Sequence, residues 1–184
     1  MDIAAEEIVG FWRQAGRERW FAKNDAFDRD IRARFEAAHH AAARGDLDAW
    51  AATADGALAL LLLLDQFPRN MYRGSAHAFA TDPVARLWAR RAIAEGHDLR
   101  AGEDVRFFFY LPLEHSEDLA DQLECLRLVE AWIAQGGGPD NLRWVRIHGE
   151  IIGRFGRFPH RNAALGRETT AAERAFLAEG GFSG

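Results

Sequence analysis

The chain has 184 residues, 48% of them hydrophobic and 28% charged, which is ordinary for one globular domain. A net charge of −5 argues against a general nucleic-acid binder, because such proteins normally carry a basic surface. The single cysteine, Cys125, cannot form a disulfide within the chain, and this fits a reducing compartment. We therefore expect a cytoplasmic protein with one domain over residues 1–184 and no nucleic-acid partner.

Two features of the chain argue against secretion and membrane insertion. The first ten residues, MDIAAEEIVG, lack the basic stretch and apolar core of a secretory leader. The apolar run over residues 58–64 is far shorter than the ~20 residues that cross a bilayer. We expect neither a leader nor a membrane partner.

Apolar residues recur at helical spacing through the first half of the chain. They predict helices over residues 3–14, 25–44, 46–52 and 55–66. The last of these is apolar on every side, as expected of a helix buried at the centre of a domain rather than lying on its surface.

Helix caps are the clearest signals of the second half. They mark helix starts at Asp82, Ser116 and Thr170, the last as part of a capping box with Glu173. The predicted helices run over residues 82–96, 116–135, 140–158 and 170–180, whereas the aromatic run over 103–111 is ambiguous. No alternating strand pattern is present, so we predict an all-α protein of eight to ten helices arranged as antiparallel pairs.

One phrase occurs twice in the chain. Phe-Pro followed by Arg-Asn stands at residues 67–70 and, with His160 inserted, at residues 158–162. Each copy follows an apolar helical segment, and proline lacks an N–H and restricts the residue before it. We therefore expect both helices to stop at Phe-Pro and to present their arginines to one shared polar site.

Three long phrases are distinctive: LLLLDQFPRNMYR at residues 61–73, FYLPLEHSED at 109–118 and IIGRFGRFPHRNAALGR at 151–167. Together with the aromatic residues of the first helices, they resemble the bacterial family known as domain of unknown function 924. The resemblance covers nearly the whole chain. It implies a tetratricopeptide-like helical fold, and it implies no activity.

Asp65, Arg69 and Arg73 are spaced four residues apart. They would share one face of a continuous helix, but we expect Pro68 to break it, so that Asp65 and Arg69 meet across the turn. One interpretation is a buried structural ion pair between Asp65 and Arg69. The other is a ligand site in which Arg69, Asn70 and Arg73 bind an anion, since a guanidinium matches a carboxylate or phosphate in two-point geometry.

The densest cluster of reactive side chains covers residues 114–118. Ser116 can cap the following helix, and Glu117 and Asp118 then lie in its first turn, where the helix dipole favours negative charge. Capping does not explain Glu114 and His115, and a histidine beside a carboxylate can act as a general base. No metal-binding spacing is present, so we expect neither a metal nor another cofactor.

Residues 143–174 form a basic stretch, with seven arginines against three glutamates. Aromatic residues and glycines alternate with these arginines, which allows the guanidinium groups to stack on rings. His160 is a candidate acid/base group, whereas His148 falls on an apolar helix face and is expected to be a hydrogen-bonded core histidine. The candidate ligand-binding residues of the stretch are Arg154, Arg157, Arg161 and Asn162.

Three classes of function fit these patterns. The leading one is a binding protein that presents an arginine-lined groove to an anionic small molecule or an acidic peptide. The second is a hydrolase or transferase that uses His115 or His160 as acid/base, with arginines stabilising negative charge. In the third, the polar motifs form an internal salt-bridge network that fixes helix packing. No feature of the sequence indicates an oligomeric state.

Overall fold

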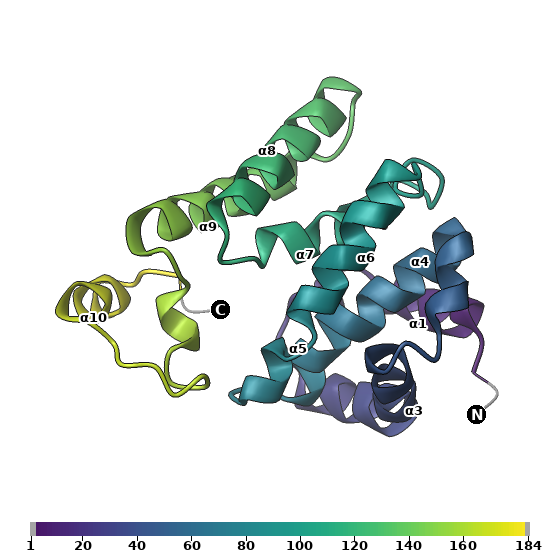
Figure 1. Ribbon diagram of the computed structural model, residues 1–184, viewed down its shortest axis with the longest axis horizontal. Helices are drawn as coiled ribbons and strands as arrows, with labels where there is room; N and C mark the ends of the chain where they lie inside the picture. The colour runs from purple at the N-terminus through teal and green to yellow at the C-terminus, as the bar shows by residue number, and fades with distance from the viewer. Residues whose placement is uncertain (1–2, 183–184) are drawn as a thin grey trace. The chain divides into compact units, whose positions relative to one another are not determined.

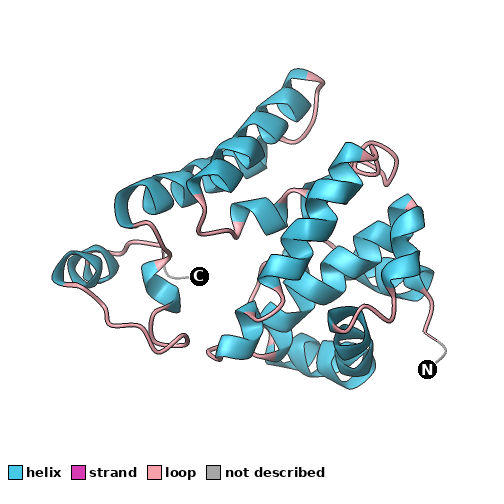
Figure 2. Ribbon diagram, viewed as in Figure 1, coloured by secondary structure: helices cyan, strands magenta, loops and turns pink. Residues whose placement is uncertain are grey.

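The computed structural model describes residues 3–182 and builds them from helices joined by short loops and turns (Figure 1). No strand occurs in these residues (Figure 2). The all-α class predicted from the sequence is therefore confirmed. Over the same range, no helix is long and apolar enough to cross a membrane.

The chain divides into two compact units. Unit 1 comprises the residues up to Arg73 together with His77–Pro112, and unit 2 comprises Gly74–Ala76 and the residues from Leu113 onward. Each unit buries its own apolar residues and is described by itself. The expectation of one domain over residues 1–184 stays a prediction.

Unit 1 is built from the first six α-helices. They are α1 Ala5–Ala15, α2 Arg17–Trp20, α3 Asp25–Ala43, α4 Ala54–Leu61, α5 Phe67–Met71 and α6 Asp82–Ala94. The α-helix predicted over residues 46–52 is instead a short 3₁₀ helix, Asp48–Ala52, and the ambiguous aromatic run contains another, Arg106–Phe109.

Helix α4 is the core of unit 1. It packs against α1 and α6, and every side chain of residues 58–64 is at most 1% exposed. An aromatic cluster lies beside it, in which Trp12 contacts the rings of Phe27, Phe67 and Phe108 at centroid distances of 6.1, 5.5 and 5.5 Å. The predicted central apolar helix is confirmed, because an all-apolar sequence has no side that favours water.

The first Phe-Pro phrase does not stop its helix. The helical backbone continues from α4 through a π-helical turn, Leu62–Gln66, into α5. The Phe67 N–H donates to the carbonyl five residues before it. Proline normally clashes with the carbonyl four residues before it, and the wider π turn gives the Pro68 ring room. The expected stop is therefore wrong, and Asp65 and Arg69 stay one helical turn apart.

Unit 2 contains an antiparallel helix pair. Helices α8, Leu119–Ala134, and α9, Leu142–Phe155, pack side by side in opposite directions (Figure 1). This hairpin is the kind of helix pair that the family resemblance implies. Helix α7, Leu111–Glu114, precedes the pair and α10, Ala171–Ala178, follows it, with Phe176 packing on a core that includes Phe158.

A glycine, and not the second Phe-Pro phrase, ends α9. Gly156 has a φ of +67°, and its N–H donates to the Ile152 carbonyl at 2.8 Å. Glycine adopts this left-handed conformation without the strain that a Cβ would add. Phe158 is extended, and Pro159–Arg161 forms a 3₁₀ turn. The expectation that the helix runs on to Phe158 is therefore wrong.

The helix that follows residues 114–118, α8, begins later in the chain than expected. Asp118, and not Ser116, caps α8, since its Oδ1 accepts the Ala120 N–H at 2.9 Å. The Ser116 hydroxyl accepts the Asp118 N–H at 3.1 Å and donates to Asp121 Oδ2 at 2.6 Å. Ser116 therefore fixes the turn before the helix. By contrast, the capping box predicted at Thr170 and Glu173 is confirmed.

Replacing Asp118 with alanine is expected to lower the free energy of unfolding by about 1 kcal/mol, because an N-cap side chain typically contributes ~0.5–2 kcal/mol. Urea unfolding followed by circular dichroism measures the change. Asp118→Asn is the matched control, since asparagine accepts the same hydrogen bond and should preserve stability within about 0.5 kcal/mol. Equal losses in both variants would show that the charge, and not the cap, is what matters.

Candidate functional site

In unit 1, Arg69 is bound by two carboxylates. Its Nη1 and Nη2 donate to the two oxygens of Asp82, each at 3.0 Å, and Nη1 also lies 3.2 Å from Asp65 Oδ1. The Asp65 side chain is 1% exposed. Burial opposes the charge of Arg69, but the two carboxylates more than offset it, so that the pKa of Arg69 is raised above its ordinary value. An incoming anion would have to displace Asp82.

The other two ligand candidates of the first phrase are engaged as well. Arg73 contacts Asp28 of α3 through Nε at 2.6 Å and Nη2 at 3.1 Å, and Asn70 donates to the same carboxylate at 2.8 Å. These contacts tie α5 to α3. Anion binding by Arg69, Asn70 and Arg73 stays a prediction. An anion would have to displace the carboxylates that these side chains already bind.

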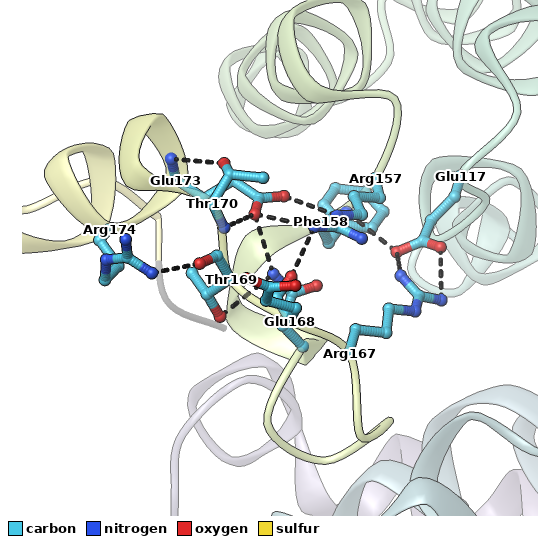
Figure 3. Close-up of polar contacts among 10 residues, drawn as sticks. Glu117, Arg157, Phe158, Arg167, Glu168, Thr169, Thr170, Glu173 and Arg174 are labelled. Atoms are coloured by element: carbon cyan, nitrogen blue, oxygen red, sulfur yellow. Dashed lines mark hydrogen bonds and ion pairs between the residues drawn. The ribbon is translucent and has the colours of Figure 1, made fainter.

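In unit 2, the Glu173 carboxylate accepts hydrogen bonds from several donors (Figure 3). Arg157 donates two hydrogen bonds to this carboxylate, from Nε to Oε1 at 2.6 Å and from Nη2 to Oε2 at 2.9 Å. The Thr170 N–H and Asn162 Nδ2 also donate to Oε2, at 2.7 and 3.3 Å. The hydrogen bonds from Arg157, followed by those from Thr170, outweigh burial and lower the pKa of Glu173 to about 2.

Glu117 is the second internal acid that an arginine binds. Arg167 donates to its two oxygens at 2.9 and 2.8 Å, and Oε1 also accepts the Phe158 N–H at 2.9 Å (Figure 3). Burial raises the pKa of Glu117, but these donors more than offset it and the pKa falls below its ordinary value. The first-turn role expected for Glu117 in α8 is therefore wrong, because it anchors the turn after α9 instead.

Glu114 and His148 meet inside unit 2. Glu114 Oε1 lies 2.6 Å from His148 Nδ1, and the two side chains are 2% and 8% exposed. Gln122 of α8 fixes the end of α7 by donating to the Glu114 carbonyl at 2.6 Å. Neither nitrogen of His148 has a hydrogen-bond partner within the described residues, so the contact is an ion-pair distance without hydrogen-bond alignment. His148 is buried as predicted, but the hydrogen bond predicted for it is absent from these residues.

Two further histidines lie near this pair. The His115 ring is 6.4 Å from that of His148. His160 and His148 both contact the Phe158 ring, at 5.6 and 5.3 Å, and both contact Phe182, at 5.2 and 4.6 Å. We call Glu114, His115, His148 and His160 the histidine cluster.

The chain returns to the histidine cluster after α10 through a glycine. The Gly181 N–H donates to the Phe176 carbonyl at 2.9 Å. A Cβ at Gly181 would lie 2.5 Å from that carbonyl oxygen, so a larger residue would force the backbone apart there. Glycine at this position thus lets Phe182 reach the imidazole rings.

Two arginines of the basic stretch stack on aromatic rings. The Arg161 guanidinium lies 4.4 Å from the centroid of Phe158, and the Arg161 side chain is buried. Arg154 is exposed and lies over Phe155 and Phe176, at 4.6 and 5.7 Å. Arg161 therefore shares the Phe158 ring with His148 and His160.

His148 Nε2, Glu114 Oε2 and Asn162 Oδ1 are among the buried polar atoms of unit 2 that have no hydrogen-bond partner within the described part of the chain. An unpaired buried polar atom costs about 1–3 kcal/mol. Such atoms are uncommon in proteins unless an ordered water, an ion or a bound molecule completes them. They are the feature of unit 2 that points to a ligand.

Cys125 is fully buried, and burial, followed by the nearby Glu114 charge, raises the pKa of its thiol well above the usual value. A thiol in this state is a poor nucleophile. Residues 3–182 contain no group of three or more His, Cys, Asp or Glu side chains placed to hold a metal ion.

Sequence reasoning singled out Glu114, His115 and His160 as candidates, but it assigned His148 to the apolar core. Glu114 and His115 were candidates as neighbours, whereas the structure pairs Glu114 with His148, 34 positions along the chain. No spacing rule reports a contact across two helices. The two Phe-Pro phrases belong to different units, so their expected proximity stays a prediction.

Known proteins place the chain in a family. The profile of a family described as "Bacterial protein of unknown function (DUF924)" matches residues 8–181. The chain is also similar to the solved structure of a protein of unknown function, ATU0120, from Agrobacterium tumefaciens. The two sequences are 51% identical, the match covers 95% of this chain and 97% of the other, and the TM-score is 0.90. No curated protein matches the chain.

Proposed function

Because the chain belongs to the family of bacterial proteins of unknown function called DUF924, we propose its function from the chemistry of unit 2: the protein binds a small anionic molecule at the histidine cluster. Arg161 and His160 supply the positive charge and the donors, and His148 Nε2 accepts a hydrogen bond from the bound molecule. The observation that carries the proposal is the buried His148 Nε2, which has no partner within the described residues.

The state of the other arginines supports this location. Arg69, Arg73, Arg157 and Arg167 each hold a carboxylate of the chain through two bonds, so an anion gains little by competing with them. In contrast, Glu114 Oε2 and His148 Nε2 of the histidine cluster have no hydrogen-bond partner within the described residues and would gain one from a bound molecule. A charge-assisted hydrogen bond is about twice as strong as a neutral one.

The unpaired atoms also constrain the ligand. Glu114 Oε2 and Asn162 Oδ1 are acceptors, whereas Arg161 and a protonated imidazole are donors. A molecule that satisfies both sets carries a carboxylate or phosphate together with a hydroxyl or amino group. Hydroxy acids and amino acids have this combination.

Calorimetric titration with inorganic phosphate, simple carboxylates and hydroxy acids tests the proposal. We expect at least one hydroxy acid to bind, and His160→Gln to weaken it by at least about tenfold, because a hydrogen bond to a charged group contributes about 1.5–3 kcal/mol. Arg154→Gln is the matched control, since this exposed arginine of the same unit lies outside the histidine cluster and its loss should leave binding unchanged. Equal weakening in both variants, or no binding by any probe, would contradict the proposal.

The alternative in which the polar motifs form an internal network has its own support. In unit 1, Arg69 and Arg73 bind Asp82 and Asp28, acids that belong to α6 and α3. In unit 2, Glu173 ties α10 to Arg157. We propose that these pairs fix helix packing, while the histidine cluster carries the binding function.

A further inference from the structure

Glu114 and His148 form a carboxylate–imidazole pair enclosed by rings. His148 Nδ1 lies 2.6 Å from Glu114 Oε1, and both side chains are nearly inaccessible to solvent. Phe158 and Phe182 pack edge-on against the imidazole at 5.3 and 4.6 Å. Because these walls exclude water, the charge of one partner acts strongly on the other.

The two nitrogens of His148 have different surroundings. Nδ1 lies 2.6 Å from the carboxylate oxygen Glu114 Oε1. Nε2 has no partner in the described residues. A carboxylate that accepts the Nδ1 proton fixes the tautomer and leaves the lone pair on Nε2.

We infer that His148 is a proton-transfer group, with Nε2 as the reacting atom, and that Glu114 is a positioning residue that acts through Nδ1. The inference rests on the proposed function, because the anion site holds the molecule that exchanges the proton. That molecule's O–H or N–H bond breaks, its electron pair stays on the molecule, and the proton bonds to the Nε2 lone pair. Glu114 balances the positive charge that the ring then carries.

His148 fits this role through its contact with a carboxylate. Glu114 Oε1 lies 2.6 Å from its Nδ1. The titratable groups around the pair are His115 beside α7, Cys125 on α8 and His160 in the turn after α9. Burial raises the pKa of Cys125, so its thiol stays neutral.

Nuclear magnetic resonance of the ring nitrogens tests the tautomer directly. At a pH where the imidazole is neutral, we expect the His148 proton on Nδ1 and the lone pair on Nε2. This readout needs no ligand and no access to the site. A neutral ring protonated on Nε2 would overturn the inference.

Diethyl pyrocarbonate, which modifies neutral imidazole nitrogens, tests reactivity at each histidine by peptide mass spectrometry across a range of pH. Phe182→Ala should expose His148 and speed its modification relative to the wild-type protein. At a pH where the imidazole is neutral in both proteins, adding Glu114→Gln to that background should slow the modification, because an amide is a weaker acceptor than a carboxylate for the Nδ1 proton and leaves Nε2 less nucleophilic. The exposed His40 of unit 1 is the internal reference and should not change.

Two outcomes of the labelling would overturn the inference: an unmodified His148 in the folded Phe182→Ala protein, or an unchanged rate and pH profile after Glu114→Gln. Circular dichroism confirms folding in each case. Anion binding is measured separately by calorimetry. Loss of binding with a reactive His148 therefore counts against the proposed function alone, and an inert His148 with intact binding counts against the inference alone.

Discussion

Replacing Arg69 with methionine is expected to lower the free energy of unfolding by about 3–5 kcal/mol, the usual loss when one partner of a buried ion pair is removed. The substitution leaves Asp65, which is 1% exposed, without its arginine and deprives Asp82 of both its bonds from Arg69. Methionine keeps most of the side-chain volume, so the loss reports the charge and not a cavity. Urea unfolding followed by circular dichroism gives the value.

Arg73→Met is the matched control for this measurement. Arg73 also holds a carboxylate through two bonds, but its side chain is 39% exposed, so water can replace the contact. Exposed ion pairs contribute about 0–1 kcal/mol, and a loss in this range is expected. Similar losses for Arg69→Met and Arg73→Met would contradict the assignment of Arg69 to a buried network.

Glu173→Gln is expected to release α10 from unit 2. Glu173 accepts four hydrogen bonds, from Arg157, Thr170 and Asn162, and it forms the capping box of an eight-residue helix. An isolated helix of this length is unstable in water, so its amides should exchange nearly as fast as those of an unfolded peptide. Hydrogen–deuterium exchange resolved by mass spectrometry measures this. The amides of α8 should keep their protection.

Arg174→Ala is the control for α10, because Arg174 is exposed and donates a hydrogen bond to the Thr169 carbonyl and not to Glu173 within the described residues. Its α10 amides should exchange as in the wild-type protein. Faster exchange in both variants would mean that any change in α10 detaches it. Unchanged exchange in Glu173→Gln would show that apolar packing by Phe176 holds the helix without the acid.

The hydrogen bonds of the Glu173 carboxylate also make the amide protection of α10 depend on pH in the acid range. The pKa of Glu173 is about 2 in the folded protein, below the ordinary glutamate value of about 4.3. A lowered pKa means that the stabilisation is complete above the ordinary value and is lost as the pH falls through about 2. Amide protection of α10 should therefore decline over this acid range, and Glu173→Gln should remove the dependence.

Local signals in the sequence determined the helices. The apolar residues 58–64 predicted a central helix, and the structure buries all of them. The Thr170 capping box was equally legible, because a cap depends only on residues within one turn. The distinctive phrases also indicated the family that the profile match then showed.

The tertiary structure decided how the chain passes each proline and what each polar side chain binds. The Phe67-Pro68 stop was overridden by a π turn inside a buried helix, and α9 ended at Gly156 because glycine offered a left-handed cap earlier. Glu117, expected in the first turn of a helix, binds Arg167 fifty residues away, and Glu114 pairs with His148 across two helices. Sequence spacing reports neighbours on one helix, whereas ion pairs between helices depend on packing. The sequence by itself therefore determined the helical class and offered Glu114, His115 and His160 as candidates, and only the packing of the helices brought His148, expected in the core, against Glu114.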